Sequence, residues 1–162
     1  MTFTAGTKVR ASDLNDLADE GSATYEYANL STTINNLAVI TFTAMLDGSS
    51  NSCGVAFVAP PSGQVVIRWG ANIVSGTTSS TVLTGTAVRQ GATIGSGTIV
   101  DDVADADCFE VNSTTRVPGQ RERQVDGLTA GNSYNARISW RNSGSTTSTA
   151  NKPWISVTPV PA

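Results

Sequence analysis

The sequence contains no histidine, and this absence removes several kinds of chemistry at once. Histidine is the commonest general base near neutral pH, a partner in Ser–His and Cys–His nucleophilic pairs, and a frequent zinc ligand. The sequence also lacks a CxxC pair, a glycine-rich phosphate loop and an HExxH motif. We therefore expect a protein that is not an enzyme and that has no catalytic residue, cofactor or metal.

Charge is scarce as well, since charged residues make up 14% of the 162 residues and the formal net charge is −3. Lys8 and Lys152 are the only lysines. Nucleic-acid binding needs clustered Lys and Arg to neutralise phosphates, so a nucleic-acid partner is excluded. No apolar run could span a bilayer, and the N-terminus has no apolar signal-peptide core. We expect no membrane partner and synthesis in a cytoplasm.

The few charges that exist are grouped by sign. The densest acidic group is Asp101, Asp102, Asp105 and Asp107, and most of the arginines follow it at Arg116, Arg121, Arg123, Arg137 and Arg141. The aspartates offer oxygens that calcium prefers, but they lack the glycine and final glutamate of the standard calcium loop, which favours a solvated loop. The arginines fit either local ion pairs or complementary charge between copies in an oligomer.

Cysteine is limited to Cys53 and Cys108, both in strand-like contexts. Disulfides are rare in a reducing cytoplasm. We expect two buried thiols that behave as small hydrophobic side chains, although the spacing does not exclude pairing.

Serine and threonine supply about a quarter of the chain, and short alternating apolar runs dominate the rest. The predicted strands are 39–45, 53–58, 64–74, 82–88, 98–100, 108–111, 134–141 and 154–158. Turn-forming Gly, Ser, Asn and Asp separate them. Short strands at this spacing, without helices between them, predict an all-β domain over residues 25–162, an antiparallel β-sandwich or jelly roll.

The segment Leu128-Thr-Ala-Gly-Asn-Ser-Tyr134 predicts a particular turn within this domain. A Leu-x-x-Gly-x-x-Tyr spacing places a tyrosine just after a tight corner, where its hydroxyl can bond to the preceding backbone. We therefore assign Leu128, Gly131 and Tyr134 to a structural corner.

Residues 1–24 predict a different element, a short extended arm followed by a helix. Leu14 and Leu17 form one apolar stripe, and Gly21 ends the helix. A helix of this length is unstable alone in water, so it must lie on its own sheet, on a neighbouring subunit or on a larger assembly. The candidate docking residues are Phe3, Val9, Leu14 and Leu17.

The N-terminus also carries a resemblance. Residues 4–15, Thr-Ala-Gly-Thr-Lys-Val-Arg-Ala-Ser-Asp-Leu-Asn, resemble the opening of many small virion proteins of tailed bacteriophages, especially phages of actinobacteria. Residues 127–141 and 154–159 are similar to the end of phage β-sandwich domains, whereas the middle of the chain resembles them only in general character. The resemblance implies a structural virion protein, assembled in the host cytoplasm and commonly homotrimeric. Its partners would be capsid or tail proteins, with the N-terminal segment docked on the particle.

Two functions remain open within this interpretation. The chain has no heptad repeat, collagen-like shaft or second domain, which favours capsid decoration or a short head fibre over a long fibre. The alternative is a minor tail or fibre protein acting as a carbohydrate-binding module for host adhesion, with a glycan partner. Its candidate aromatic platforms are Trp69, Trp140 and Trp154, and the strand pattern places at least two of them in the core.

Overall fold

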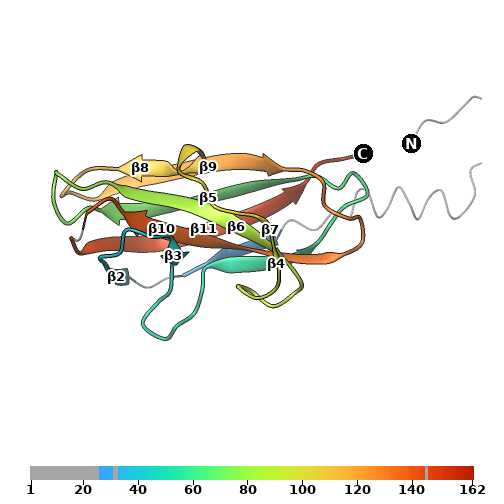
Figure 1. Cartoon of the computed structure of the whole chain (residues 1–162), viewed down its shortest axis with the longest axis horizontal. Helices are drawn as coiled ribbons and strands as arrows, with labels where there is room; N and C mark the ends of the chain where they lie inside the picture. The colour runs from blue at the N-terminus through green and yellow to red at the C-terminus, as the bar shows by residue number, and fades with distance from the viewer. Residues whose placement is uncertain (1–25, 31–32, 145) are drawn as a thin grey trace, which may run out of the picture.

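The computed structural model describes residues 26–30, 33–144 and 146–162. The predicted arm and helix, with Phe3, Val9, Leu14 and Leu17, lie outside the described residues. The described part contains eleven strands and one 3₁₀ turn, η1 (Asp105–Asp107), which confirms the all-β prediction (Figure 1). It contains no helix long and apolar enough to cross a membrane.

One sheet of the domain, here called sheet A, has four antiparallel positions. Its order is β1 (Glu26–Asn29), β11 (Ser148–Pro159), β5 (Val65–Val74) and β9 (Val117–Val125). β2 (Thr33–Leu37) also pairs with β11, beyond the end of β1. β1 and β2 therefore share one edge of β11, while β9 forms the opposite edge of the sheet.

The second sheet, here called sheet B, repeats this arrangement. β10 (Ser133–Asn142) and β6 (Val82–Gln90) are its central strands. β3 (Thr43–Ala44) and β4 (Gly54–Val58) lie end to end along β10, and β7 (Ile99–Asp101) and β8 (Phe109–Val111) lie end to end along β6. Counting each end-to-end pair as one interrupted strand gives four strands per sheet, the strand number of a jelly roll.

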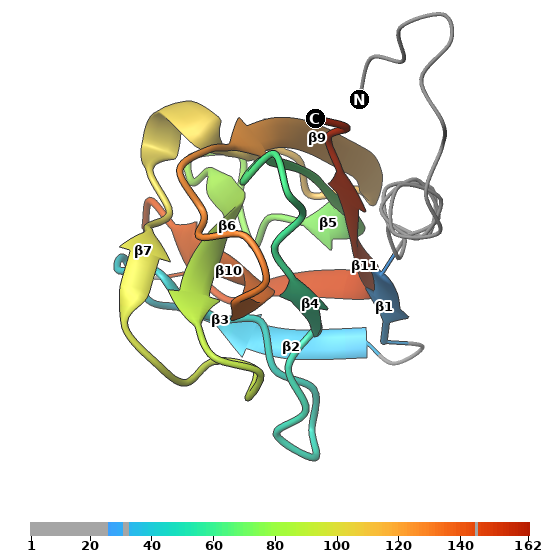
Figure 2. The same ribbon diagram turned by 90° about the vertical axis from the view of Figure 1, so that its right-hand side faces the viewer.

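The core lies between the two sheets, which form two layers (Figure 2). Alternate residues of β5, β10 and β11 supply it, as a period of two predicts. Trp69 is fully buried there, and its Nε1 donates a hydrogen bond to the Thr84 carbonyl oxygen of the other sheet at 3.0 Å. Trp140 is 3% exposed. Both indoles are therefore core side chains.

The strand predictions need several corrections, since β1, β2 and the first half of β11 lie outside the predicted runs. Two further differences concern the run 39–45 and β9. The run 39–45 forms only the two-residue β3, and Val39 and Ile40 are 43% and 62% exposed. β4 occupies most of this edge of β10, so β3 can pair only with Ser139 and Trp140.

The other correction is β9, which the sequence pattern did not reveal. Its inward positions include Arg121 and Arg123, where an alternating strand would carry apolar residues. Arg121 donates to the carbonyl oxygens of Cys108 and Ala106, and Arg123 donates to Thr86 and pairs with Asp101. These arginines close the open edge between the two sheets. Pro118 is tolerated because β9 is an edge strand.

Leu128, Gly131 and Tyr134 lie in and beside the turn that joins β9 to β10. The Tyr134 hydroxyl oxygen accepts a hydrogen bond from the Thr129 backbone N–H at 3.0 Å. Gly131 has φ of +78°, a conformation that favours glycine. Leu128 is buried, and Tyr134 stacks on Phe57 at a centroid distance of 6.0 Å. The tyrosine thus ties the turn to the end of β4.

Both cysteines are buried free thiols. Burial raises the pKa of Cys53 to about 12. Burial, followed by the negative charge of Asp105, raises the pKa of Cys108 to about 12. Both thiols therefore stay protonated at neutral pH.

Candidate functional site

The third tryptophan, Trp154, lies on the outer face of sheet A. It occupies the middle of a cross-strand row formed by Asn29 of β1, Trp154 of β11, Gly70 of β5 and Gln120 of β9. Its neighbour Ile155 points into the core and is fully buried, whereas Trp154 is partly exposed. Of the three candidate aromatic platforms, Trp154 alone is on the surface.

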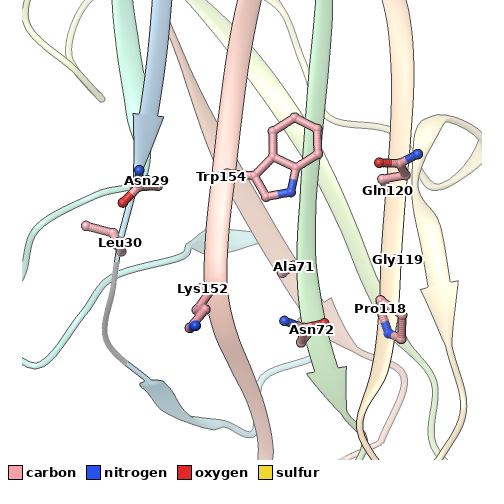
Figure 3. A pocket seen from close by; sticks show the side chains of 9 residues that line it. All are labelled: Asn29, Leu30, Ala71, Asn72, Pro118, Gly119, Gln120, Lys152 and Trp154. Carbon is pink, nitrogen blue, oxygen red and sulfur yellow. The ribbon is translucent and has the colours of Figure 1, made fainter.

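Gly70 determines how the indole lies. A β-carbon at this position would come within 2.7 Å of Trp154 Nε1 and 2.9 Å of Cε2. The ring therefore covers the space that a side chain at position 70 would fill. Figure 3 shows the indole nearly face-on between β11 and β5, so its other face is turned outward.

The strand that carries Trp154 is interrupted immediately before it. The register of β11 against β5 shifts between Asn151 and Trp154, which marks a β-bulge. Lys152 takes a positive φ of 49°, and Pro153, which has no N–H to donate, falls inside the bulge. The bulge places two residues, Lys152 and Pro153, opposite the single β5 residue Ala71, and it allows a proline in an interior strand.

A hollow of about 740 Å³ lies beside the indole. Its lining comes from four strands and the residues that follow them: Asn29, Leu30, Ala71, Asn72, Pro118, Gly119, Gln120, Lys152 and Trp154. Figure 3 shows Gln120 on the β9 side of the ring and Asn72 near Lys152. We call this feature the Trp154 hollow.

The polar groups of the Trp154 hollow are mostly amides. The side chains of Asn29, Asn72, Gln120 and Lys152 make no hydrogen bond to any other side chain or backbone group in the described part of the chain. No carboxylate lines the hollow, and the nearest row of the sheet carries the Arg68–Glu122 ion pair, at 2.7 Å. The site offers one aromatic face, several donors and acceptors, and a single exposed ammonium.

The side chains of the lining are amides, apolar groups and one amine. The lining contains no thiol, hydroxyl or carboxylate side chain that could act as a nucleophile or acid. Elsewhere among the described residues, no three potential ligands of the Asp, Glu, Cys and His types gather as a metal site would require.

Some of the charged groups that the sequence singled out form local ion pairs. Asp101 pairs with Arg123, and Asp105 pairs with Arg141. The hydrogen bond from Arg141 lowers the pKa of the Asp105 carboxyl. Arg121 bonds to backbone carbonyl oxygens, so three of the five arginines, Arg121, Arg123 and Arg141, bond within the same chain.

Sequence reasoning named Trp154 but missed the residues around it. Gly70, Asn72 and Gln120 belong to the site because β5 and β9 are neighbours, and β9 was not predicted. Pro153 beside Trp154 was the available signal, since a proline within a strand pattern indicates a bulge.

No protein-family model and no curated protein matches the sequence. The fold resembles a chain of the T13 viral particle of infectious bursal disease virus (IBDV), at 10% identity and a TM-score of 0.52, covering 84% of this chain and 31% of the other. The VP2 subviral particle of that virus gives 10% identity and 0.49, covering 83% and 32%. The CBM22-1 xylan-binding domain of Paenibacillus barcinonensis Xyn10C gives 10% identity and 0.39, covering 83% and 86%.

The chain spans about a third of the length of the viral chains that it matches. At these identities the likeness concerns the fold alone. It agrees with the two antiparallel sheets described above and identifies the domain as a β-sandwich.

Proposed function

We propose that the protein is a structural component of a bacteriophage virion, with its β-sandwich displayed on the particle and its N-terminal segment docked there. The observation that carries this proposal is that the described residues form a hydrophobic core of their own. Buried residues of both sheets, between Ile34 and Val157, form one continuous cluster. We assign the docking role to residues 1–24 because the phage-like motif lies there.

Two further points support a virion role. Jelly-roll sandwiches are a common architecture of viral capsid domains. Charged residues are few, and three of the seven arginines in the described part form ion pairs within the chain, which disfavours a basic face for nucleic acid. Within the virion we favour a homotrimeric capsid decoration or head-fibre protein, assembled in the host cytoplasm.

The test is a truncation combined with particle binding. A variant without residues 1–19 should keep a cooperative β-sandwich unfolding transition and fail to bind capsids that lack this protein, whereas the full chain should bind them stoichiometrically. Particle binding by the truncated chain would refute N-terminal docking. Loss of the unfolding transition would show that the segment belongs to the domain. Cryo-electron microscopy of the particle would then give the copy number and distinguish capsid from tail.

A second candidate, host adhesion by a minor tail or fibre protein, is favoured by one observation. The outward indole of Trp154 stands beside a hollow lined with amides, a combination suited to small polar ligands. The two candidates differ in what the isolated chain should bind.

A further inference from the structure

We infer that the Trp154 hollow is a glycan-binding site, in which one pyranose ring stacks on the indole and its hydroxyl groups bond to the surrounding amides. The inference rests on the second candidate function and names its ligand class and the residues that would bind the ligand.

The first argument is the position of the indole. One ring face covers Gly70, where a β-carbon would come within 2.9 Å of the ring, and the opposite face is turned outward. A flat, partly exposed ring supported by the sheet is a preformed apolar surface, and a site that needs no rearrangement loses little entropy on binding. The C–H face of a pyranose is the flat apolar surface that matches it.

The second argument is the ring of amides. Asn29 and Gln120 belong to the same cross-strand row as Trp154, and Asn72 lies two residues beyond Gly70 along β5. Each primary amide carries two donors and an acceptor, so these side chains can bond to hydroxyl groups in either direction. A sugar ring has C–H groups on its face and hydroxyl groups around its edge. The site matches both, with an apolar indole face and amides around it.

The third argument is charge and size. The lining has no carboxylate and one ammonium, that of the exposed Lys152. This composition favours neutral sugars and tolerates an acidic one. The volume of about 740 Å³ lies within the range of small-molecule sites, and the hollow is open to solvent along the sheet.

A protein partner fits the hollow less well. Its apolar lining besides Trp154 is limited to Leu30, Ala71, Pro118 and Gly119, too little for the hydrophobic centre of a stable interface. The amides around it would be desolvated by a flat protein surface that offers few hydroxyl groups.

The experiment uses the full chain on an array of neutral gluco-, galacto-, manno- and xylo-oligosaccharides together with oligosaccharides that contain uronic acid. The best binders are then titrated by calorimetry against W154A and F42A. Phe42 is the matched control, because it is a partly buried aromatic residue away from the hollow, just before β3 and beside Arg141. We expect W154A to weaken binding about tenfold or more and F42A to leave it unchanged.

Single amide variants and a charge variant sharpen the result. N72A and Q120A should each weaken binding about threefold to tenfold. K152Q should weaken only the uronic-acid ligands, which separates an acidic from a neutral glycan. Absence of binding across the array, or binding that W154A leaves unchanged, would overturn the inference. Neither result would affect the particle-binding test of the N-terminal segment.

Discussion

The two sheets present very different outer faces, although both contribute the same kind of apolar inner face. Loop residues cover the outer face of sheet B: Ile94 lies over Gly54, and Val103 and Cys108 lie over Gly85. On the outer face of sheet A, the Trp154 side chain lies over Gly70, and a hollow remains beside it. On both sheets a glycine makes room for the side chain of another residue. On sheet B the outer face is covered in this way, whereas on sheet A the indole borders an open hollow.

Asparagines on the two faces show the same contrast. Asn135 of β10 is fully buried under residues 91–97, where its amide accepts from Gly95 N–H and donates to the carbonyl oxygens of Gly91 and Ser96. Asn72 of β5 is partly exposed and makes no hydrogen bond through its side chain within the described part. One amide stabilises the fold, and the other is available to a ligand.

The largest expected effect on stability comes from removing the Asn135 amide, with removal of the Asn72 amide as the comparison. N135A should lower the free energy of unfolding by about 3 kcal/mol, because the buried amide is removed and three backbone groups of residues 91–96 lose their partner. N72A should change it by less than about 0.5 kcal/mol. Urea unfolding of both variants checks the contrast. Equal costs would mean that the outer face of sheet A is as much a part of the packed structure as that of sheet B.

The next effect concerns the glycine beneath the indole. G70A should cost about 1–3 kcal/mol, because its β-carbon would meet the Trp154 ring and also the Gly119 carbonyl oxygen at 2.8 Å. Since Trp69 and Trp140 are buried, Trp154 should dominate acrylamide quenching of the tryptophan fluorescence. G70A should therefore increase quenching as the ring is displaced.

W154F serves as the reference for this measurement, because it removes the exposed indole and leaves the two buried ones. If G70A leaves both stability and quenching unchanged, the ring does not rest on the glycine and the platform is not preformed.

The sequence predicted what depends on periodicity and missed what depends on pairing between distant strands. The alternation in 64–74 and 134–141 identified β5 and β10, and the burial of Trp69 and Trp140 followed from it. β9 was missed because its inward positions hold arginines, which interact with backbone groups of the β8 and β6 regions.

The Trp154 hollow was missed because it depends on the pairing of distant strands. Its members become neighbours only through the pairing of β1, β11, β5 and β9. A pattern read along the chain does not reveal that Gly70 faces Trp154 on one side and Gln120 on the other. The bulge at Lys152 and Pro153 likewise depends on the register between two strands.

A smaller effect, the reactivity of the Cys108 thiol, tests whether residues 102–108 stay packed on the outer face of sheet B. The Cys108 thiol packs over Gly85, and its pKa is raised to about 12, first by burial and then by Asp105. In a C53S background, Cys108 should react with a thiol reagent at pH 8 more than about tenfold more slowly in the folded chain than in urea. Rapid reaction of the folded chain would show that residues 102–108 lift from the sheet, and would weaken the contrast between the two faces.

The raised thiol pKa values also give a pH dependence with a definite sign. The unfolded thiols have the ordinary pKa of 9.0, so the unfolded state loses protons first as the pH rises above that value. The contribution of the buried neutral thiols is complete below about pH 9 and is lost as the pH rises towards 12. Replacing both cysteines by alanine should flatten the decline of stability in this window, measured by thermal unfolding from pH 7 to 10.

The smallest effect should come from the ion pair that joins the covering turn η1 to β10. The Nε of Arg141 donates to Asp105 Oδ1 at 2.9 Å, and this hydrogen bond lowers the pKa of the Asp105 carboxyl below its ordinary 3.8. The unfolded state therefore binds a proton at higher pH than the folded state, so the stabilisation is present above about pH 4 and is lost as the pH falls through the folded pKa. D105N should lower the melting temperature slightly at pH 7 and flatten its decline between pH 5 and 3, whereas D107N, which changes an adjacent aspartate outside this pair, should preserve the steeper decline. Because the pair is exposed, a large loss in D105N at pH 7 would mean that the turn is held to the sheet mainly by charge, and that the cover of sheet B is weaker than its packed side chains indicate.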